Sequence, residues 1–149
     1  MVCFASGICL CFFSDDCGEV KVLSGDNGTI KSHSLFGIRD YYNNMSCEWS
    51  IVGREGQVIA FHFVAFEVES GSNGSTLSSG QDCDTDSLTI YDGAGSDRSK
   101  LNVVCGSELP LDMYTSGPNA SLSFKTNEAV TKKGFLLSYS IVDEPGKLR

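Results

Sequence analysis

Apolar residues recur at every second position over most of the chain, and this pattern restricts the fold more than any other feature. The segments that show it are residues 47–51, 88–90, 101–105, 122–124 and 135–141. Such alternation indicates half-buried strands, and no helical pattern competes with it. Turn residues such as Gly and Pro separate the segments, as in antiparallel sandwiches and barrels. The sequence therefore predicts an all-β fold, and it places Leu101, Val103 and Cys105 on one face of their strand.

One predicted strand, QVIAFHFVAFEVE at residues 57–69, changes phase in its middle. Its large apolar residues alternate up to Phe63 and resume three positions later at Phe66. Because a one-residue slip turns every following side chain to the other face, a bulge or kink at residues 64–65 is expected. The side chains expected to be buried are Phe61, Phe63, Phe66 and Val68. Glu67 and Glu69 then point outward, with Glu69 exposed at a loop edge.

The length and charge of the chain limit its possible partners. The 149 residues suffice for one domain with a sizeable core. A net charge of −8 argues against nucleic acid, because phosphate binding needs clustered Lys and Arg. Residues 55–97 contain eight acidic residues and no Lys or Arg, with the highest density near Cys83. The acidic stretch can serve as a solvated surface, a metal site or a docking patch for a basic partner.

The cysteines favour an oxidising compartment. There are seven of them: Cys3, Cys9, Cys11, Cys17, Cys47, Cys83 and Cys105. Their spacing does not match a zinc site. Three lie within the first eleven residues, so the remaining four are an even number that suits two disulfides. Four cysteines allow three connectivities, and the residues alone do not choose between them.

The N-terminus and the sequons also indicate secretion. Residues 2–13 (VCFASGICLCFF) form an apolar run with the length of a signal-peptide core, too short to span a membrane. We expect residues 1–16 to be a signal peptide or its remnant; the alternative is an arbitrary fragment boundary. Residues 143–149 are expected to be a linker or tail. Four N-x-[ST] sequons predict glycosylation at Asn27, Asn44, Asn73 and Asn119.

Signatures of catalysis are missing. The two histidines, His33 and His62, do not belong to an HExxH motif, and no Ser is flanked as in G-x-S-x-G. An EF-hand calcium loop is excluded because Leu88 stands where a ligand is needed. Trp49 shares a face with Cys47 and is expected to be a core residue. We predict no catalytic residue.

The order of several segments resembles the CUB domain family. The matching segments are CGEV from residue 17, GTIKS from 28, YYNNMSCEWSI from 41, VIAFHFVAFEVE from 58, CDTDSLTIYDG from 83, VVCGSELP from 103, SLSFKTNE from 121 and KGFLLSYSIV from 133. The resemblance covers residues 17–142. The chain departs from the family at Ser32–His33, where a Pro is usual, and in the long loop between Glu69 and Cys83.

The resemblance implies a jelly-roll-like β-sandwich with Cys17 bonded to Cys47 and Cys83 to Cys105. Many CUB domains bind calcium, and their ligand pattern falls on Glu69, Asp86 and Asn127 of this sequence. The third residue is Asn where the calcium-binding members usually have Asp. An amide oxygen can ligate calcium, but the lost charge should weaken binding.

Two further acids can compensate for the missing charge. These are Asp84, in phase with Asp86, and Glu67, in phase with Glu69. Solvation of the whole stretch stays an alternative to a metal site. The calcium hypothesis also depends on the mutual repulsion of Glu69 and Asp86, which would otherwise be uncompensated.

The expected function is that of a secreted, non-catalytic module that binds protein. A calcium-organised acidic edge would accept a Lys or Arg of an extracellular partner, with no nucleic acid and no membrane span involved. One alternative is an accessory domain of a multidomain secreted protease, joined to further domains of a longer parent chain. Another is a calcium-independent module that binds glycans or is purely structural.

Overall fold

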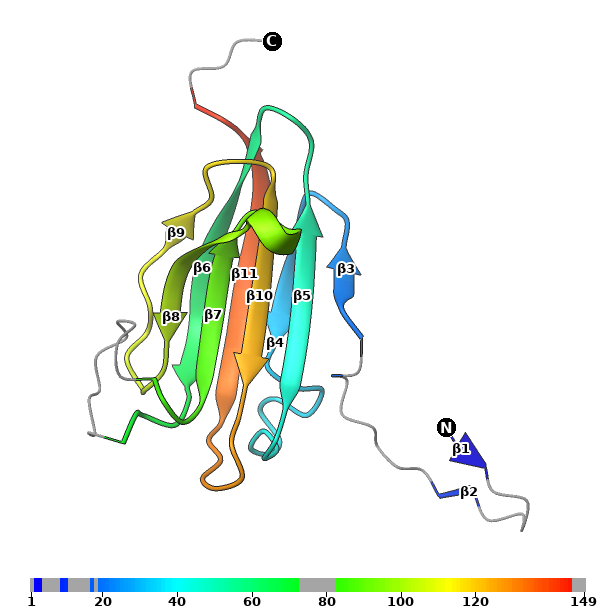
Figure 1. Cartoon of the computed structure of the whole chain (residues 1–149), viewed down its shortest axis with the longest axis vertical. Coiled ribbons are helices and arrows are strands. Elements are labelled where there is room, and N and C mark those ends of the chain that lie inside the picture. Colours follow the sequence, from blue (N-terminus) through cyan, green and yellow to red (C-terminus); the bar gives the residue numbers. More distant parts are fainter. Residues whose placement is uncertain (1, 4–8, 11–16, 18, 73–82, 146–149) are drawn as a thin grey trace.

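The computed structural model describes residues 2–3, 9–10, 17, 19–72 and 83–145. Two sheets face each other and enclose the core (Figure 1). The five-stranded sheet has the order β3 (Lys21–Leu23), β5 (Ser46–Val52), β10 (Asn119–Lys125), β7 (Ser87–Asp92) and β8 (Ser99–Val104). The four-stranded sheet has the order β4 (Asn27–Lys31), β11 (Gly134–Asp143), β6 (Gln57–Glu67) and β9 (Met113–Tyr114). The predicted all-β sandwich is confirmed.

The remaining elements are small. β1 (Val2–Cys3) pairs with β2 (Cys9–Leu10). One 3₁₀ turn, η1 (Gly95–Asp97), is the only helical element among the described residues. Strand pairs in the sandwich are antiparallel, apart from the parallel pair of β3 and β5. The described part of the chain contains no helix with the length and hydropathy that a membrane crossing requires.

Aromatic side chains from both sheets form the centre of the core. Phe124 of β10 and Phe135 of β11 are fully buried, and their ring centroids are 5.1 Å apart in an edge-to-face arrangement. Trp49 of β5 is 5% exposed and also meets Phe135 edge-to-face, which confirms its expected place in the core. Such pairs add about 0.5–1.5 kcal/mol to the free energy gained from burial.

The predicted bulge lies in β6. Leu136 of β11 pairs with Ala65, and the next residue, Leu137, pairs with Phe63, so Val64 is the extra residue. Val64 is exposed, whereas Phe66 on the far side of the bulge is buried. All four side chains expected in the core are buried: Phe61, Phe63, Phe66 and Val68.

The prediction that Leu101, Val103 and Cys105 lie on one face of their strand, β8, is wrong at Val103. The register of β7 with β8 shifts between two pairs, Ile90↔Asn102 and Tyr91↔Lys100. Leu101 is therefore the extra residue of this pairing, and the strand changes phase. Val104 becomes fully buried opposite Leu88, while Val103 is half-buried.

Both disulfides implied by the resemblance are present. Cys17 is bonded to Cys47 with a Cα–Cα distance of 4.4 Å, and Cys83 to Cys105 with a distance of 5.7 Å. Cys83–Cys105 joins the segment before β7 to the end of β8. Most of the expected leader 1–16 and tail residues 146–149 lie outside the described residues.

Candidate functional site at the acidic end of the sandwich

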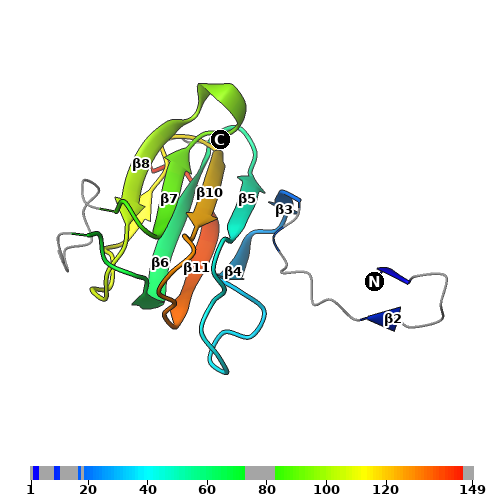
Figure 2. The same cartoon turned by 60° about the horizontal axis from the view of Figure 1, so that its bottom comes forward.

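The connections from β4 to β5, from β6 to β7 and from β10 to β11 meet at one end of the sandwich, which Figure 2 turns toward the viewer. Antiparallel strands bring the end of β6, the start of β7 and the end of β10 to this end. Glu69 follows β6, Asp86 directly precedes β7, and Asn127 follows β10. Tyr41 comes from the segment between β4 and β5. We call these four residues the acidic end.

Asp86 is the most enclosed of these residues, with none of its surface exposed. Its Oδ1 accepts a hydrogen bond from the backbone N–H of Asn127 at 2.8 Å. Its Oδ2 accepts one from the Tyr41 hydroxyl at 2.6 Å. Burial raises the pKa of Asp86, and the hydrogen bonds from Tyr41 and Asn127 oppose that effect because they stabilise the carboxylate.

Tyr41 connects the two acids. Its hydroxyl donates to Asp86 and accepts from the backbone N–H of Glu69 at 3.0 Å. The side chain is 1% exposed, and burial together with the hydrogen bond to Asp86 raises its pKa far above the ordinary value. The hydroxyl therefore stays a proton donor and holds the Asp86 carboxylate in one orientation.

Glu69 is half-buried, so the expected exposure of this side chain is wrong. Its side chain lies outside the hydrophobic core, as the phase change predicts, but the loops that meet at this end cover it. Its Oε2 is buried and accepts no hydrogen bond. Burial and the charge of Asp86 raise its pKa, while the Thr85 hydroxyl and Lys132 oppose that rise.

Asn127 is half-buried beside the two carboxylates. Its backbone N–H donates to Asp86, and its side-chain Oδ1 accepts from the backbone N–H of Ala129 at 3.0 Å. The fold thus brings all three residues that the resemblance named into one network, through Tyr41 and the Asn127 backbone.

The two acids considered as compensation have partners of their own. Asp84 accepts a hydrogen bond from the backbone N–H of Ser72 at 2.8 Å, and hydrogen bonds from Ser72 lower its pKa. Glu67 lies 3.6 Å from the Nζ of Lys133. Neither acid needs a metal for its local structure. A third acid of the stretch, Asp82, lies outside the described residues.

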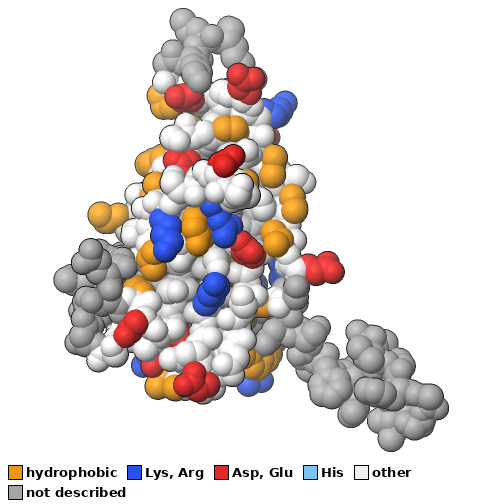
Figure 3. Space-filling view, in the orientation of Figure 1, with side chains coloured by type: hydrophobic (Ala, Val, Ile, Leu, Met, Phe, Trp, Pro, Cys, Tyr) orange, Lys and Arg blue, Asp and Glu red, His pale blue; other side chains and the backbone are white. Residues whose placement is uncertain are grey.

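The acidic stretch has counter-charges in three dimensions. Lys133 pairs with Glu67, and the charge of Lys132 lowers the pKa of Glu69. The expected repulsion between Glu69 and Asp86 is present but partly offset, because Asp86 raises the pKa of Glu69 and Lys132 of the β10–β11 loop opposes that rise. Figure 3 shows acidic side chains at this lower end and basic ones mainly over the middle of the visible face.

The residues of the acidic end suit a hard cation. Within the described residues, no three His, Cys, Asp or Glu side chains are grouped as in a metal site. The set here has two carboxylates and one amide, all oxygen donors of the kind calcium prefers. The buried Glu69 Oε2 without a donor is the observation that favours a cation, because a buried charged oxygen normally has a partner.

Both histidines have structural partners. His33 is buried, with its Nδ1 2.7 Å from Ser32 Oγ and its Nε2 2.6 Å from the Arg39 carbonyl oxygen. His62 is exposed and lies 2.7 Å from Asp112. These contacts give both histidines structural roles.

Comparison with known proteins decides the family. A family model of the CUB domain matches residues 17–139. The chain belongs to the CUB domain family. It is 30% identical over 132 residues to Tolloid-like protein 1 of Mus musculus, which covers 89% of this chain and 12% of that protein. It is 35% identical over 123 residues to cubilin of Canis lupus familiaris, covering 83% of this chain and 3% of that protein. The chain therefore spans only a small part of the length of these relatives.

A solved structure supports the same fold. The CUB2 domain of MASP-1, determined with bound Ca²⁺, superposes with a TM-score of 0.64 at 22% identity. The match covers 80% of this chain and 96% of that chain. At this identity the likeness establishes the CUB fold only.

Sequence reasoning missed two contributors to the acidic end. Tyr41 was part of a matching segment, but a tyrosine gives no sign of which carboxylate it will contact across 45 positions. Lys132 belonged to a basic cluster at the other end of the sequence. The position of Tyr41 at the start of a matching segment that continues into a predicted strand was the available signal.

Proposed function

We propose that this CUB domain is an extracellular, non-catalytic module that binds protein through its acidic end. The observation that carries the proposal is the buried, unpartnered Glu69 Oε2 beside the fully buried Asp86. Two neighbouring carboxylates with raised pKa values favour uptake of a cation or of a basic side chain.

Glu69, Asp86 and Asn127 would hold Ca²⁺ in this proposal. Bound calcium supplies the positive charge that offsets the two carboxylates. Tyr41 keeps Asp86 oriented, and the Asn127 backbone fixes the second oxygen of that carboxylate. Asn127 contributes a neutral oxygen in place of a charged one, so affinity should be lower than with Asp at this position.

The same acids are proposed to accept a Lys or Arg of an extracellular partner. Loops from β6, β7 and β10 present them at one end of the sandwich, where a partner can approach. Lys132 lies near Glu69 and offsets part of its charge, so the end is suited to one basic side chain in addition to the bound calcium. Binding of this kind should weaken as the salt concentration rises.

Calorimetric titration of Ca²⁺ into chelator-stripped protein tests the metal site. Asn127→Asp should tighten binding and increase calcium-induced thermal stabilisation, because a ligand bound only by the folded state raises stability. Asp86→Ala should abolish both effects. Asp84→Asn is the matched control, since it removes a nearby charge whose carboxylate bonds to Ser72. No calcium-induced shift in either the parent or Asn127→Asp would contradict the metal site.

Binding arrays test the partner chemistry. Lys- and Arg-rich peptides should bind in calcium and lose binding in chelator. The same peptides with Glu in place of Lys and Arg are the control. Calcium-independent binding to a glycan array, without binding to the basic peptides, would contradict the proposal and favour a carbohydrate-binding module.

A further inference from the structure

Three of the four sequons lie within the described residues, and the structure gives them unequal surroundings. Asn44 is exposed, and so is Ser46, the hydroxyl residue of its sequon. Asn44 has a φ of 57° and is the only non-glycine residue with positive φ in the described part of the chain. Asparagine adopts this conformation more readily than most residues, so the turn is suited to it.

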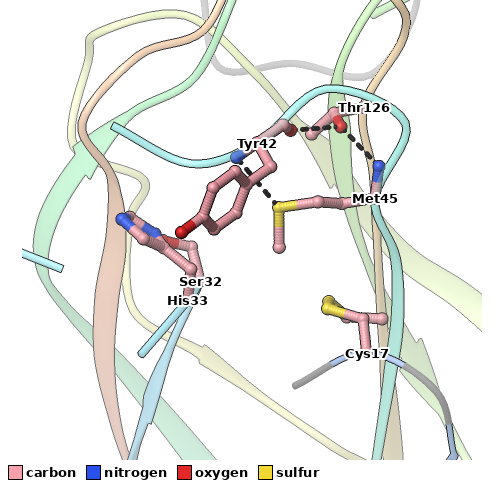
Figure 4. The surroundings of a disulfide bond; sticks show 7 residues. Cys17, Ser32, His33, Tyr42, Met45 and Thr126 are labelled. Carbon is pink, nitrogen blue, oxygen red and sulfur yellow. Dashed lines mark hydrogen bonds between the residues drawn. A yellow bond between two sulfur atoms is a disulfide. The ribbon is translucent and has the colours of Figure 1, made fainter. Parts of the chain in front are cut away.

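The turn that carries Asn44 is fixed to the sandwich. The backbone N–H of Met45 donates to Thr126 Oγ1 at 2.8 Å, and that hydroxyl donates to the Tyr42 carbonyl at 2.8 Å (Figure 4). The Met45 side chain is buried, with its sulfur 3.3 Å from the Tyr42 backbone nitrogen. These contacts hold Met45 inward, while the side chain of Asn44 stays at the surface.

The turn also lies directly beside the acidic end. The backbone N–H of Asn44 donates to the Asn127 carbonyl at 2.8 Å. The backbone N–H of Asn127 in turn donates to Asp86. Asn127 therefore links the backbone of Asn44 to the buried carboxylate of Asp86.

We propose that Asn44 carries an N-linked glycan at the border of the acidic end, whereas Asn119 stays unmodified. The modification requires the secretory route assumed in the proposed function. In the transfer, Asn44 Nδ2 bonds to the anomeric carbon of an oligosaccharide carried on a lipid diphosphate. The bond from that carbon to the diphosphate breaks, Nδ2 loses one proton, and the lipid diphosphate leaves.

Asn119 offers a contrasting environment. It is the first residue of β10, a strand paired on both sides, and its carbonyl accepts the Gly93 N–H at 2.9 Å. Its side-chain Oδ1 is buried without a hydrogen-bond partner. The residue is half-buried, and the groups that enclose Oδ1 leave little room for a glycan on the same amide. Ser121 of the same sequon is buried as well, and its hydroxyl donates to the Gly93 carbonyl.

Asn27 provides an internal comparison. It is exposed at the start of β4, and β4 runs toward the acidic end, so Asn27 lies at the opposite end of the sandwich (Figure 1). A glycan there is compatible with the fold but is far from Asp86. The fourth sequon, at Asn73, lies outside the described residues.

Glycopeptide mapping of the full chain, secreted from a host that glycosylates, tests the proposal. Enzymatic release of glycans in heavy-oxygen water marks each formerly occupied asparagine. The mark is expected at Asn44 and not at Asn119. An unmarked Asn44, or a marked Asn119, in folded secreted protein would overturn the proposal.

A second measurement tests the position of the glycan. Ser46→Ala removes the Asn44 sequon and keeps the asparagine, and Thr29→Ala does the same for Asn27. Removal of the Asn44 glycan should increase binding of the basic peptides, whereas removal of the Asn27 glycan should not. An equal gain in both variants would refute a glycan that borders the acidic end. Because mapping alone decides occupancy, a failure of all peptide binding would count against the proposed function and not against the glycan.

Discussion

Replacing Tyr41 by Phe isolates the contribution of one hydroxyl group to the acidic end. The hydroxyl donates to Asp86 at 2.6 Å and accepts from the Glu69 backbone N–H at 3.0 Å. The ring itself is buried against Phe124, with centroids 5.2 Å apart, and Phe at position 41 preserves this packing. Any loss of stability therefore reports on the two hydrogen bonds.

The expected loss follows from the burial of the groups left behind. A hydrogen bond to a charged group contributes about 1.5–3 kcal/mol, and a buried N–H left unpaired costs about 1–3 kcal/mol. Asp86 is fully buried, but Glu69 is only half-buried, so the loss for Tyr41→Phe should be about 3 kcal/mol. For a domain of this size that corresponds to a fall in Tm of roughly 10 °C.

The pH dependence gives a sharper criterion. Burial raises the folded-state pKa of Asp86, and loss of the Tyr41 hydroxyl raises it further because that bond stabilises the charged form. An acid whose pKa is raised by folding destabilises the folded state at pH values above that raised pKa. It has no such effect at pH values below its unfolded-state pKa of about 3.9. The deficit of Tyr41→Phe should therefore be largest near pH 7 and shrink as the pH falls toward 4.

Urea unfolding in chelator, with the disulfides intact, measures this deficit from pH 7 to pH 4. Tyr114→Phe is the matched control, because Tyr114 is 61% exposed and the same change there should lie within about 0.5 kcal/mol of the parent. The reasoning is refuted if Tyr41→Phe loses no more than Tyr114→Phe, or if its deficit is constant over this pH range.

Three further perturbations follow from the same structure. Glu69→Gln should raise Tm in chelator at pH 7, because burial and Asp86 make the charged form of Glu69 unfavourable. The difference in Tm should be smaller near pH 4, where residue 69 is uncharged in both the parent and the variant. Equal shifts in Tm at both pH values would contradict this. Deletion of Val64 should leave cooperative melting and near-ultraviolet circular dichroism intact, since Val64 is the extra residue of the bulge. Deletion of His62 should lower Tm markedly, because it turns Phe63 outward and places Val64 at the buried position. Replacing both Cys83 and Cys105, which are 22 positions apart, by serine should lower the free energy of unfolding by about 3 kcal/mol in urea titrations. An unchanged midpoint would argue against the Cys83–Cys105 bond.

The sequence indicated the fold class because the relevant signal is local. Alternation in β5 and β11 and the jump from Phe63 to Phe66 are readable within a few positions, and each predicts burial without knowledge of a partner strand. The disulfide pairing came from the order of segments shared with the CUB family. The residues alone left three connectivities open.

Other features depended on pairing between strands. The phase change in β8 arises from a register shift against β7, and nothing within residues 99–104 shows that Leu101 is the extra residue. Val103 and Val104 are both valines, so the pattern could not tell which one enters the core. Register of this kind is set by the partner strand.

What the sequence determined by itself was that the chain forms an all-β domain and that Glu69, Asp86 and Asn127 follow or precede strands. Only the tertiary structure decided the environment of these residues. Closing the sandwich brings Tyr41 to Asp86 and Lys132 to Glu69, across 45 and 63 positions of the chain. The exposure, pKa and hydrogen bonding of a carboxylate depend on every group around it, whatever its distance along the chain. That is why Glu69, expected in solvent, is half-buried with an oxygen that accepts no hydrogen bond.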